Sequence, residues 1–100
     1  MPTYMVERFL SGMTAPDLRA AAARAKLEAA KMTKEGIAVR YLESTFSEED
    51  ETAFCLFEGP SREAIREVNV RARIPYERIA EVVHLRAEEI GSIQGKGEQT

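Results

Sequence analysis

The 100-residue chain has little of what marks a secreted or membrane protein. Its one cysteine, Cys55, cannot close a disulfide within the chain, and a lone thiol is typical of a reducing compartment. Charged side chains interrupt the first thirty residues, where a signal peptide would carry a continuous apolar segment. No stretch approaches the ~20 apolar residues that a membrane span requires. We therefore expect a cytoplasmic protein with no membrane segment.

The sequence also lacks the short motifs that bind common cofactors. It has no G-x-G-x-x-G, no P-loop, no C-x-x-C and no H-E-x-x-H, so no organic cofactor is indicated. Basic residues are in the minority, because 14 Lys and Arg stand against 17 Asp and Glu and give a formal net charge of −3. A mildly acidic chain is not drawn to phosphate backbones, which argues against nucleic acid as a partner.

The amino-acid composition of the chain is that of a globular domain. Hydrophobic residues make up 44% of the chain and charged residues 31%, which is not the balance of a disordered protein. A chain of this length has room for one hydrophobic core. The last residues are polar and contain several glycines. We expect one domain over residues 1–86 and a polar, loosely ordered tail over residues 87–100.

Apolar residues change their spacing along the chain, and these changes predict four strands and two helices. Thr14, with Asp17 three residues later, is typical of a helix N-cap. Pro75 ends the second helix, because the residue before a proline avoids the helical conformation. The expected strands cover residues 3–10, 37–46, 52–58 and 79–85, and the expected helices run from Thr14 to Glu35 and from Ser61 to Ile74.

This βαββαβ order predicts a ferredoxin-like α+β sandwich, a four-stranded antiparallel sheet with both helices on one face. Side chains that alternate along each strand then divide the sheet into two faces. The face against the helices is expected to carry Val6, Phe54, Leu56 and Val82. The open face is expected to carry Met5, Glu7, Phe9, Cys55, Phe57, Glu81 and Val83. Because that second set is too apolar to stay in water, we predict that a second copy of the chain or a ligand covers it.

Two residues suggest a soft-metal or nucleophilic role. His84 is the sole histidine, and its strand parity directs it to the face opposite Cys55, or to the strand end. We interpret His84 either as a metal ligand or as an ordinary surface side chain. Cys55 is either a thiolate ligand or nucleophile, or a small buried hydrophobe. Because of their parity, the two residues are not expected to share a metal within one subunit.

Two carboxylates suggest another kind of site. Glu7 and Glu81 are expected on neighbouring strands of the open face. Paired carboxylates in an apolar surround suit general acid–base catalysis or ligation of a cation through oxygen. Arg8 or Arg40 beside them would instead form a structural ion pair. The sequence leaves both interpretations open.

Five segments between Tyr4 and Val82 form a recognisable set. They are YMVERF at residues 4–9, RYLES at 40–44, TAFCLFE at 52–58 followed by PS at 60–61, EAIR at 63–66 and PYERIAEV at 75–82. With them the sequence resembles a family of small ferredoxin-like domains of unknown function, whose described representative is a nickel-binding, nickel-responsive dimer from an actinobacterium. The resemblance implies a homodimer that binds Ni²⁺ or another divalent transition metal.

The chain departs from that family in its second helix. Many members carry one or two histidines there, whereas this chain has Val68 and Asn69. Imidazole is the usual nickel ligand at such sites. The metal-ligand candidates that remain in this chain are Glu7, Glu81 and His84.

Two functions follow from these observations. The first is a small cytoplasmic homodimer that binds a ligand without turnover, with a transition metal such as nickel as the ligand that the resemblance implies. The second is a dimeric α/β-barrel enzyme of the monooxygenase, isomerase or cyclase type, with a small organic molecule in a pocket on the open face. In that enzyme Glu7 or Glu81 would act as the base and Tyr41 or Arg40 would stabilise an oxyanion. Tyr41 shares its parity with Glu43, so the two would line one cavity.

Overall fold

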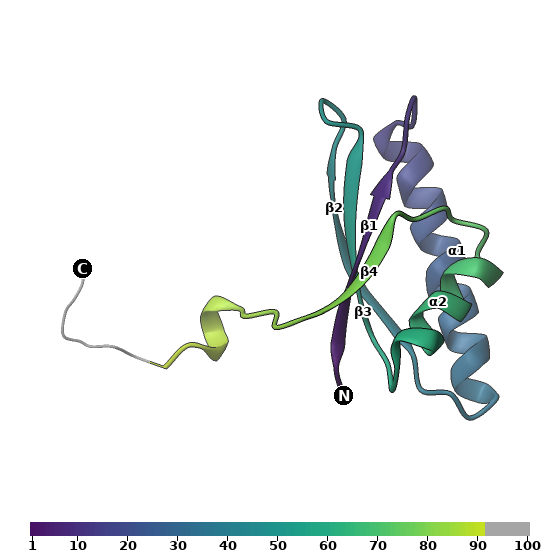
Figure 1. The fold of residues 1–100 in the computed structure, drawn as a ribbon, viewed down its shortest axis with the longest axis vertical. Coiled ribbons are helices and arrows are strands. Elements are labelled where there is room, and N and C mark those ends of the chain that lie inside the picture. The colour runs from purple at the N-terminus through teal and green to yellow at the C-terminus, as the bar shows by residue number, and fades with distance from the viewer. Residues whose placement is uncertain (92–100) are drawn as a thin grey trace.

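The computed structural model describes residues 1–91 and shows a four-stranded sheet with two helices on one face (Figure 1). The strands are β1 (Thr3–Phe9), β2 (Arg40–Ser47), β3 (Thr52–Glu58) and β4 (Arg78–Val82), and the helices are α1 (Ala15–Lys34) and α2 (Arg62–Arg71), followed by a short 3-10 turn, η1 (Ala87–Glu89). The strand order is β2-β3-β1-β4, with every neighbouring pair antiparallel. This confirms the predicted ferredoxin-like arrangement. Most of the predicted tail, residues 92–100, lies outside the described residues.

Two strand boundaries differ from the prediction by three residues. β2 begins at Arg40 rather than at residue 37, because the hydroxyl of Thr33 ties down the preceding loop. That hydroxyl accepts a hydrogen bond from the Val39 amide (3.3 Å) and donates one to the Val39 carbonyl (3.1 Å). β4 ends at Val82 and not at Leu85, and Val82 is paired with Thr3, the first residue of β1.

Helix α1 begins at the predicted cap and packs closely on the sheet. The Thr14 hydroxyl accepts a hydrogen bond from the Asp17 amide (3.4 Å), and the Asp17 carboxylate accepts one from the Thr14 amide (3.0 Å). The hydrogen bonds from Thr14 lower the pKa of the Asp17 carboxyl. The buried side of the helix carries Ala21, Ala25 and Ala29, whose small side chains let the helix lie near the strands. No helix in the described part of the chain is long and apolar enough to cross a membrane.

The cross-strand register overturns the predicted faces of β3. Val6 faces the helices, as predicted, and its partner across the ladder is Cys55. Directly paired residues share a face, so Cys55 and Phe57 also point to the helices, and both are buried. Phe54 and Leu56 lie on the other side, the open sheet face that the helices leave uncovered. The prediction was wrong because the five consecutive apolar residues 53–57 contain no alternation from which a face can be read.

The same register corrects the predicted faces of β4. Val6 is paired with Ile79 and Tyr4 with Glu81, so Glu81 lies on the helix side of the sheet, where it is exposed at the edge. Val82 therefore lies on the open face, opposite to the prediction. The predicted positions of Met5, Glu7 and Phe9 on the open face are confirmed, because they alternate with Tyr4 and Val6 along β1.

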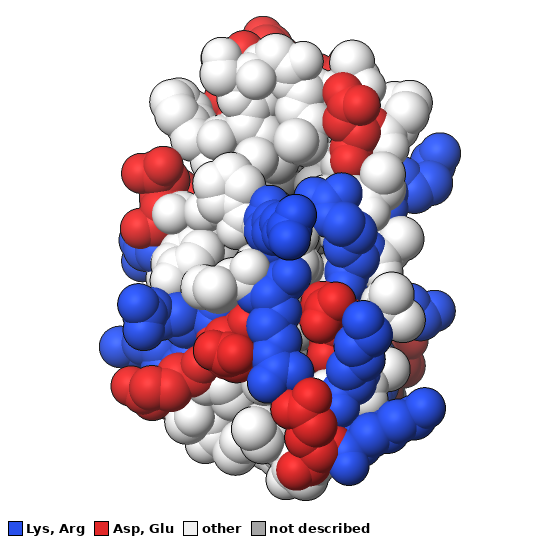
Figure 2. Space-filling view, turned by 90° about the vertical axis from the view of Figure 1, so that its right-hand side faces the viewer, with Lys and Arg blue, Asp and Glu red and all other residues white. Residues whose placement is uncertain are grey.

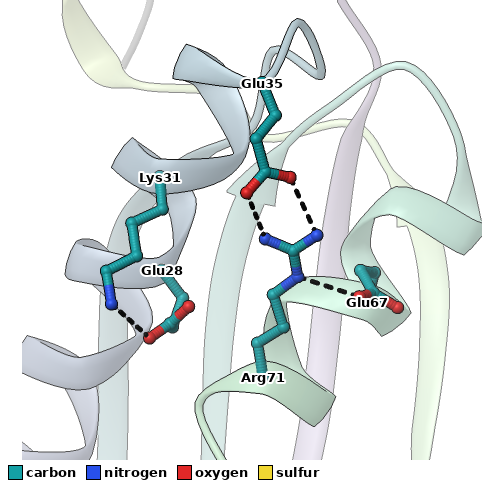
Figure 3. Close-up of polar contacts among 5 residues, drawn as sticks. All are labelled: Glu28, Lys31, Glu35, Glu67 and Arg71. Carbon is teal, nitrogen blue, oxygen red and sulfur yellow. Dashed lines mark hydrogen bonds and ion pairs between the residues drawn. The ribbon is translucent and has the colours of Figure 1, made fainter.

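The outer face of the two helices is a mixed-charge surface, and Figure 2 shows Lys and Arg beside Asp and Glu over much of it. An ion-pair cluster joins the helix ends (Figure 3). Arg71 of α2 donates to both carboxylate oxygens of Glu35 (2.9 and 3.0 Å) and to Glu67 (2.8 Å), while Lys31 pairs with Glu28 (3.4 Å). The hydrogen bond from Arg71 lowers the pKa of Glu35. Such exposed pairs each contribute little to stability.

The close contact between β3 and α2 gives a first prediction. A Cβ atom added to Gly59 would lie 2.8 Å from Cδ1 of Ile65, a side chain that is fully buried in the core. We expect Gly59→Ala to lower the free energy of unfolding by about 1–2 kcal/mol, the usual cost of overpacking. Urea unfolding followed by circular dichroism measures it. Gly91→Ala, where a Cβ meets nothing within 4 Å, is the matched control, and an equal effect in both variants would contradict the predicted clash.

Candidate metal and ligand sites

One polar contact crosses the open sheet face. Nε2 of His84 lies 3.2 Å from a carboxylate oxygen of Glu43, and both side chains are partly exposed. Glu43 belongs to β2 and His84 follows β4, which are the two edge strands of the sheet. Adjacent strands are about 4.8 Å apart, so these edges are separated by about 14 Å. The contact therefore joins a residue of one edge strand to the segment that leaves the other edge strand.

A β-bulge directs Glu43 to this face. Tyr41 is paired with Phe57, but Glu43 is paired with Leu56, so Leu42 is an extra residue in β2. An extra residue in one strand switches the faces of all side chains beyond it. Tyr41 therefore faces the helices while Glu43 faces the open side, and the prediction that they share a face is wrong.

The predicted pair of carboxylates is separated by the sheet. Glu7 lies on the open face, where Nε of Arg78 donates to it at 2.7 Å from the directly opposite position on β4. Glu81 lies on the helix side. Arg40, a predicted partner of these acids, pairs instead with Glu58 at 3.2 Å. Glu7 is thus held in a cross-strand ion pair, and the two carboxylates do not form the pair on one face that the sequence predicted.

A buried polar cluster lies on the other side of the sheet, around Arg8. Its side chain is 1% exposed, and no carboxylate among residues 1–91 lies within ion-pair distance of it. The guanidinium donates to Oδ1 of Asn69 (2.6 Å), to the Pro75 carbonyl (3.2 Å) and, through Nε, to the sulfur of Cys55 (3.3 Å). Sequence reasoning missed this cluster, although Arg8 has the parity of the buried Val6.

The buried cluster continues through hydroxyl groups to a groove at the sheet edge. Ser44 donates to the sulfur of Cys55 (3.0 Å) and is hydrogen-bonded to the Tyr41 hydroxyl (2.7 Å). The Tyr41 ring packs edge-on against Phe57, with centroids 5.5 Å apart, and burial raises the pKa of its hydroxyl. A groove of about 510 Å³ between α1 and β2 reaches Tyr41 from outside. Cys55 and His84 therefore lie on opposite faces of the sheet, the relation that parity predicted, but each on the face expected for the other.

These positions decide which residues can act together on a metal. Within residues 1–91, no three His, Cys, Asp or Glu side chains gather closely enough to hold an ion by themselves. His84 and Glu43 supply one nitrogen and one oxygen donor side by side. Glu7 and Glu81 join neither that pair nor each other. Within the described residues, the open face thus brings together two potential donors, His84 and Glu43, and no complete metal site.

Comparisons with known proteins add a family and a solved structure. The family described as nickel responsive protein SCO4226-like matches residues 4–82. The crystal structure of SCO4226 from Streptomyces coelicolor A3(2) is similar, with 27% sequence identity and a TM-score of 0.66, and the match covers 84% of this chain and 99% of that chain. No curated protein matches the chain. The family match ends at Val82, two residues before His84.

Proposed function

Because this chain belongs to the nickel responsive protein SCO4226-like family, we propose that it is a homodimer that binds nickel, or another divalent transition metal, on its open sheet face. The observation that carries the proposal is the contact between Nε2 of His84 and the Glu43 carboxylate. An imidazole nitrogen beside a carboxylate oxygen is a donor pair that suits first-row transition metals. This pair supplies the imidazole that the second helix of this chain lacks.

The incomplete ligand set favours a second copy of the chain. Two donors do not fill the coordination sphere of Ni²⁺, and the described residues bring no third to the same place. A two-fold axis across the open face would add the partner's copy of the same pair. Two imidazoles and two carboxylates form a nitrogen–oxygen set of the kind that tetragonal nickel and copper sites use.

The apolar surroundings of the pair also support the dimer. Phe9 and Phe54 project from the open face and are 64% and 38% exposed, with Met5 and Leu56 beside them half-buried. A soluble monomer seldom leaves such a contiguous apolar surface in water. A two-fold dimer buries the same patch on both subunits.

We expect His84→Ala to weaken nickel binding at least about tenfold, because even the residues that merely support a metal ligand contribute that much. The protein should be purified without a histidine tag and titrated with Ni²⁺ by calorimetry, with zinc and copper for comparison. The expected stoichiometry is one metal per two chains, and Glu43→Gln should weaken binding as well.

Glu7→Gln is the matched control, because Glu7 is also a carboxylate of the open face but is held by Arg78. The Glu7→Gln variant should bind nickel with the same affinity as the unchanged protein. Equal affinity in His84→Ala would overturn the proposed site, and loss of binding in Glu7→Gln alone would move the site to the carboxylate that the sequence first indicated.

A further inference from the structure

We propose that residues 83–90, here called the C-terminal arm, pack on the open sheet face of a second copy of the chain. This inference rests on the proposed dimer and assigns it an additional contact. The arm exposes three large apolar side chains to solvent: Val83 is 85% exposed, Leu85 67% and Ile90 54%. Apolar residues gathered on an extended segment outside the core indicate a surface that packs on something else.

The direction of the arm points to the side where a second copy would sit. Figure 1 shows the chain leaving β4 on the face opposite to the helices and running away from the sheet. Only the start of the arm is held by its own sheet, through His84 and Glu43. The family match ends at Val82, immediately before the arm begins.

The arm and its apolar acceptor lie at opposite ends of one subunit. β4 ends beside Thr3, at the start of β1, whereas the exposed Phe9 stands at the far end of β1, diagonal to Phe54 on β3. A two-fold axis that runs across the strands brings the Thr3 end of one sheet against the Phe9 end of the other. Each arm would then start next to the acceptor surface of the partner, and both copies bury their exposed apolar groups at once.

The length of the arm fits this contact. Eight residues that include one 3-10 turn reach roughly 20 Å, against a sheet width of about 14 Å between the edge strands. An arm of that length can cross the partner's sheet without unfolding β4. Its own sheet leaves Val83, Leu85 and Ile90 exposed, which favours an acceptor on another molecule.

The first test changes the arm and measures the dimer. The full chain carrying Leu85→Glu and Ile90→Glu is compared by sedimentation equilibrium with the unchanged protein and with Glu88→Gln plus Glu89→Gln, which alters only polar residues of the same segment. We expect the arm variant to raise the dimer dissociation constant at least about tenfold, because two carboxylates enter an apolar contact, and the control to leave it unchanged. A dimer of unaltered affinity in the arm variant overturns the arm contact and leaves the proposed dimer standing. A monomer for the unchanged protein overturns both.

A second test identifies the surface that receives the arm. Chains with Leu85→Cys and chains with Phe9→Cys, distinguishable by mass, are mixed and oxidised, and the native Cys55 is buried and does not compete. We expect a higher yield of the disulfide between the two different variants than of either disulfide between two chains of the same variant. If a chain carrying both substitutions forms the bond only within itself, the arm folds back on its own sheet and the inference is wrong.

Discussion

Phe57→Lys is expected to abolish folding. The Phe57 ring is fully buried between the sheet and the helices, in contact with Tyr41 and within the main hydrophobic cluster. Truncating a buried phenylalanine alone costs about 3–5 kcal/mol. Lysine adds an ammonium group with no acidic partner in that cluster, which costs several kcal/mol more or forces the group to lose its proton. The free energy of unfolding of a domain of this size is about 5–15 kcal/mol, so the substitution removes most or all of its stability.

Circular dichroism and urea unfolding of the variant test this expectation, with Phe54→Lys as the control. Phe54 is three residues earlier on the same strand but lies on the open face, where an ammonium reaches water. The control should keep its secondary structure and its cooperative unfolding, and should lose affinity for a second copy. If instead Phe57→Lys folds cooperatively, the face assignment of β3 in this structure is wrong.

The contrast between Phe57 and Phe54 also shows what the sequence can predict. The element order, the cap at Thr14 and the fold follow from spacing and capping residues, which act over a few positions. The faces of β3 do not follow, because residues 53–57 are apolar at both parities. Only the pairing of Cys55 with Val6, two residues far apart in the chain, determines which side is buried. The register between strands that are far apart in the chain cannot be read from a single sequence.

The contacts of the candidate site could not be predicted from the sequence for the same reason. His84 was indicated as the sole histidine, but its partner Glu43 depends on a bulge at Leu42 that no residue type announces. Glu7 was correctly placed on the open face, whereas its partner Arg78 could be found only from the register of β4. The residue types of the site could be recognised in the sequence, whereas the contacts between them depend on the fold.

Arg8→Ala is the second substitution with a large expected effect, at about 4 kcal/mol of unfolding free energy. The change removes a fully buried side chain and leaves a cavity, which accounts for about 2–3 kcal/mol. It also leaves the buried Oδ1 of Asn69 without its donor, at about 1–3 kcal/mol, and the carbonyl of the exposed Pro75 loses a donor as well. Against these losses stands one gain, because the folded state no longer has to bury a guanidinium that lacks an acidic partner.

The balance between these terms is measured by filling the space without the charge. Arg8→Met keeps most of the volume, so we expect it to cost about 2 kcal/mol, the share that belongs to the unpaired Asn69 oxygen. Adding Asn69→Leu to Arg8→Met removes that oxygen and should recover about 1 kcal/mol or more. Asn69→Leu alone is expected to be destabilising, because it leaves a buried Arg8 N–H group without its acceptor. Urea unfolding of the four proteins gives this double-mutant cycle. Additive losses would show that the 2.6 Å contact between Arg8 and Asn69 contributes nothing to stability.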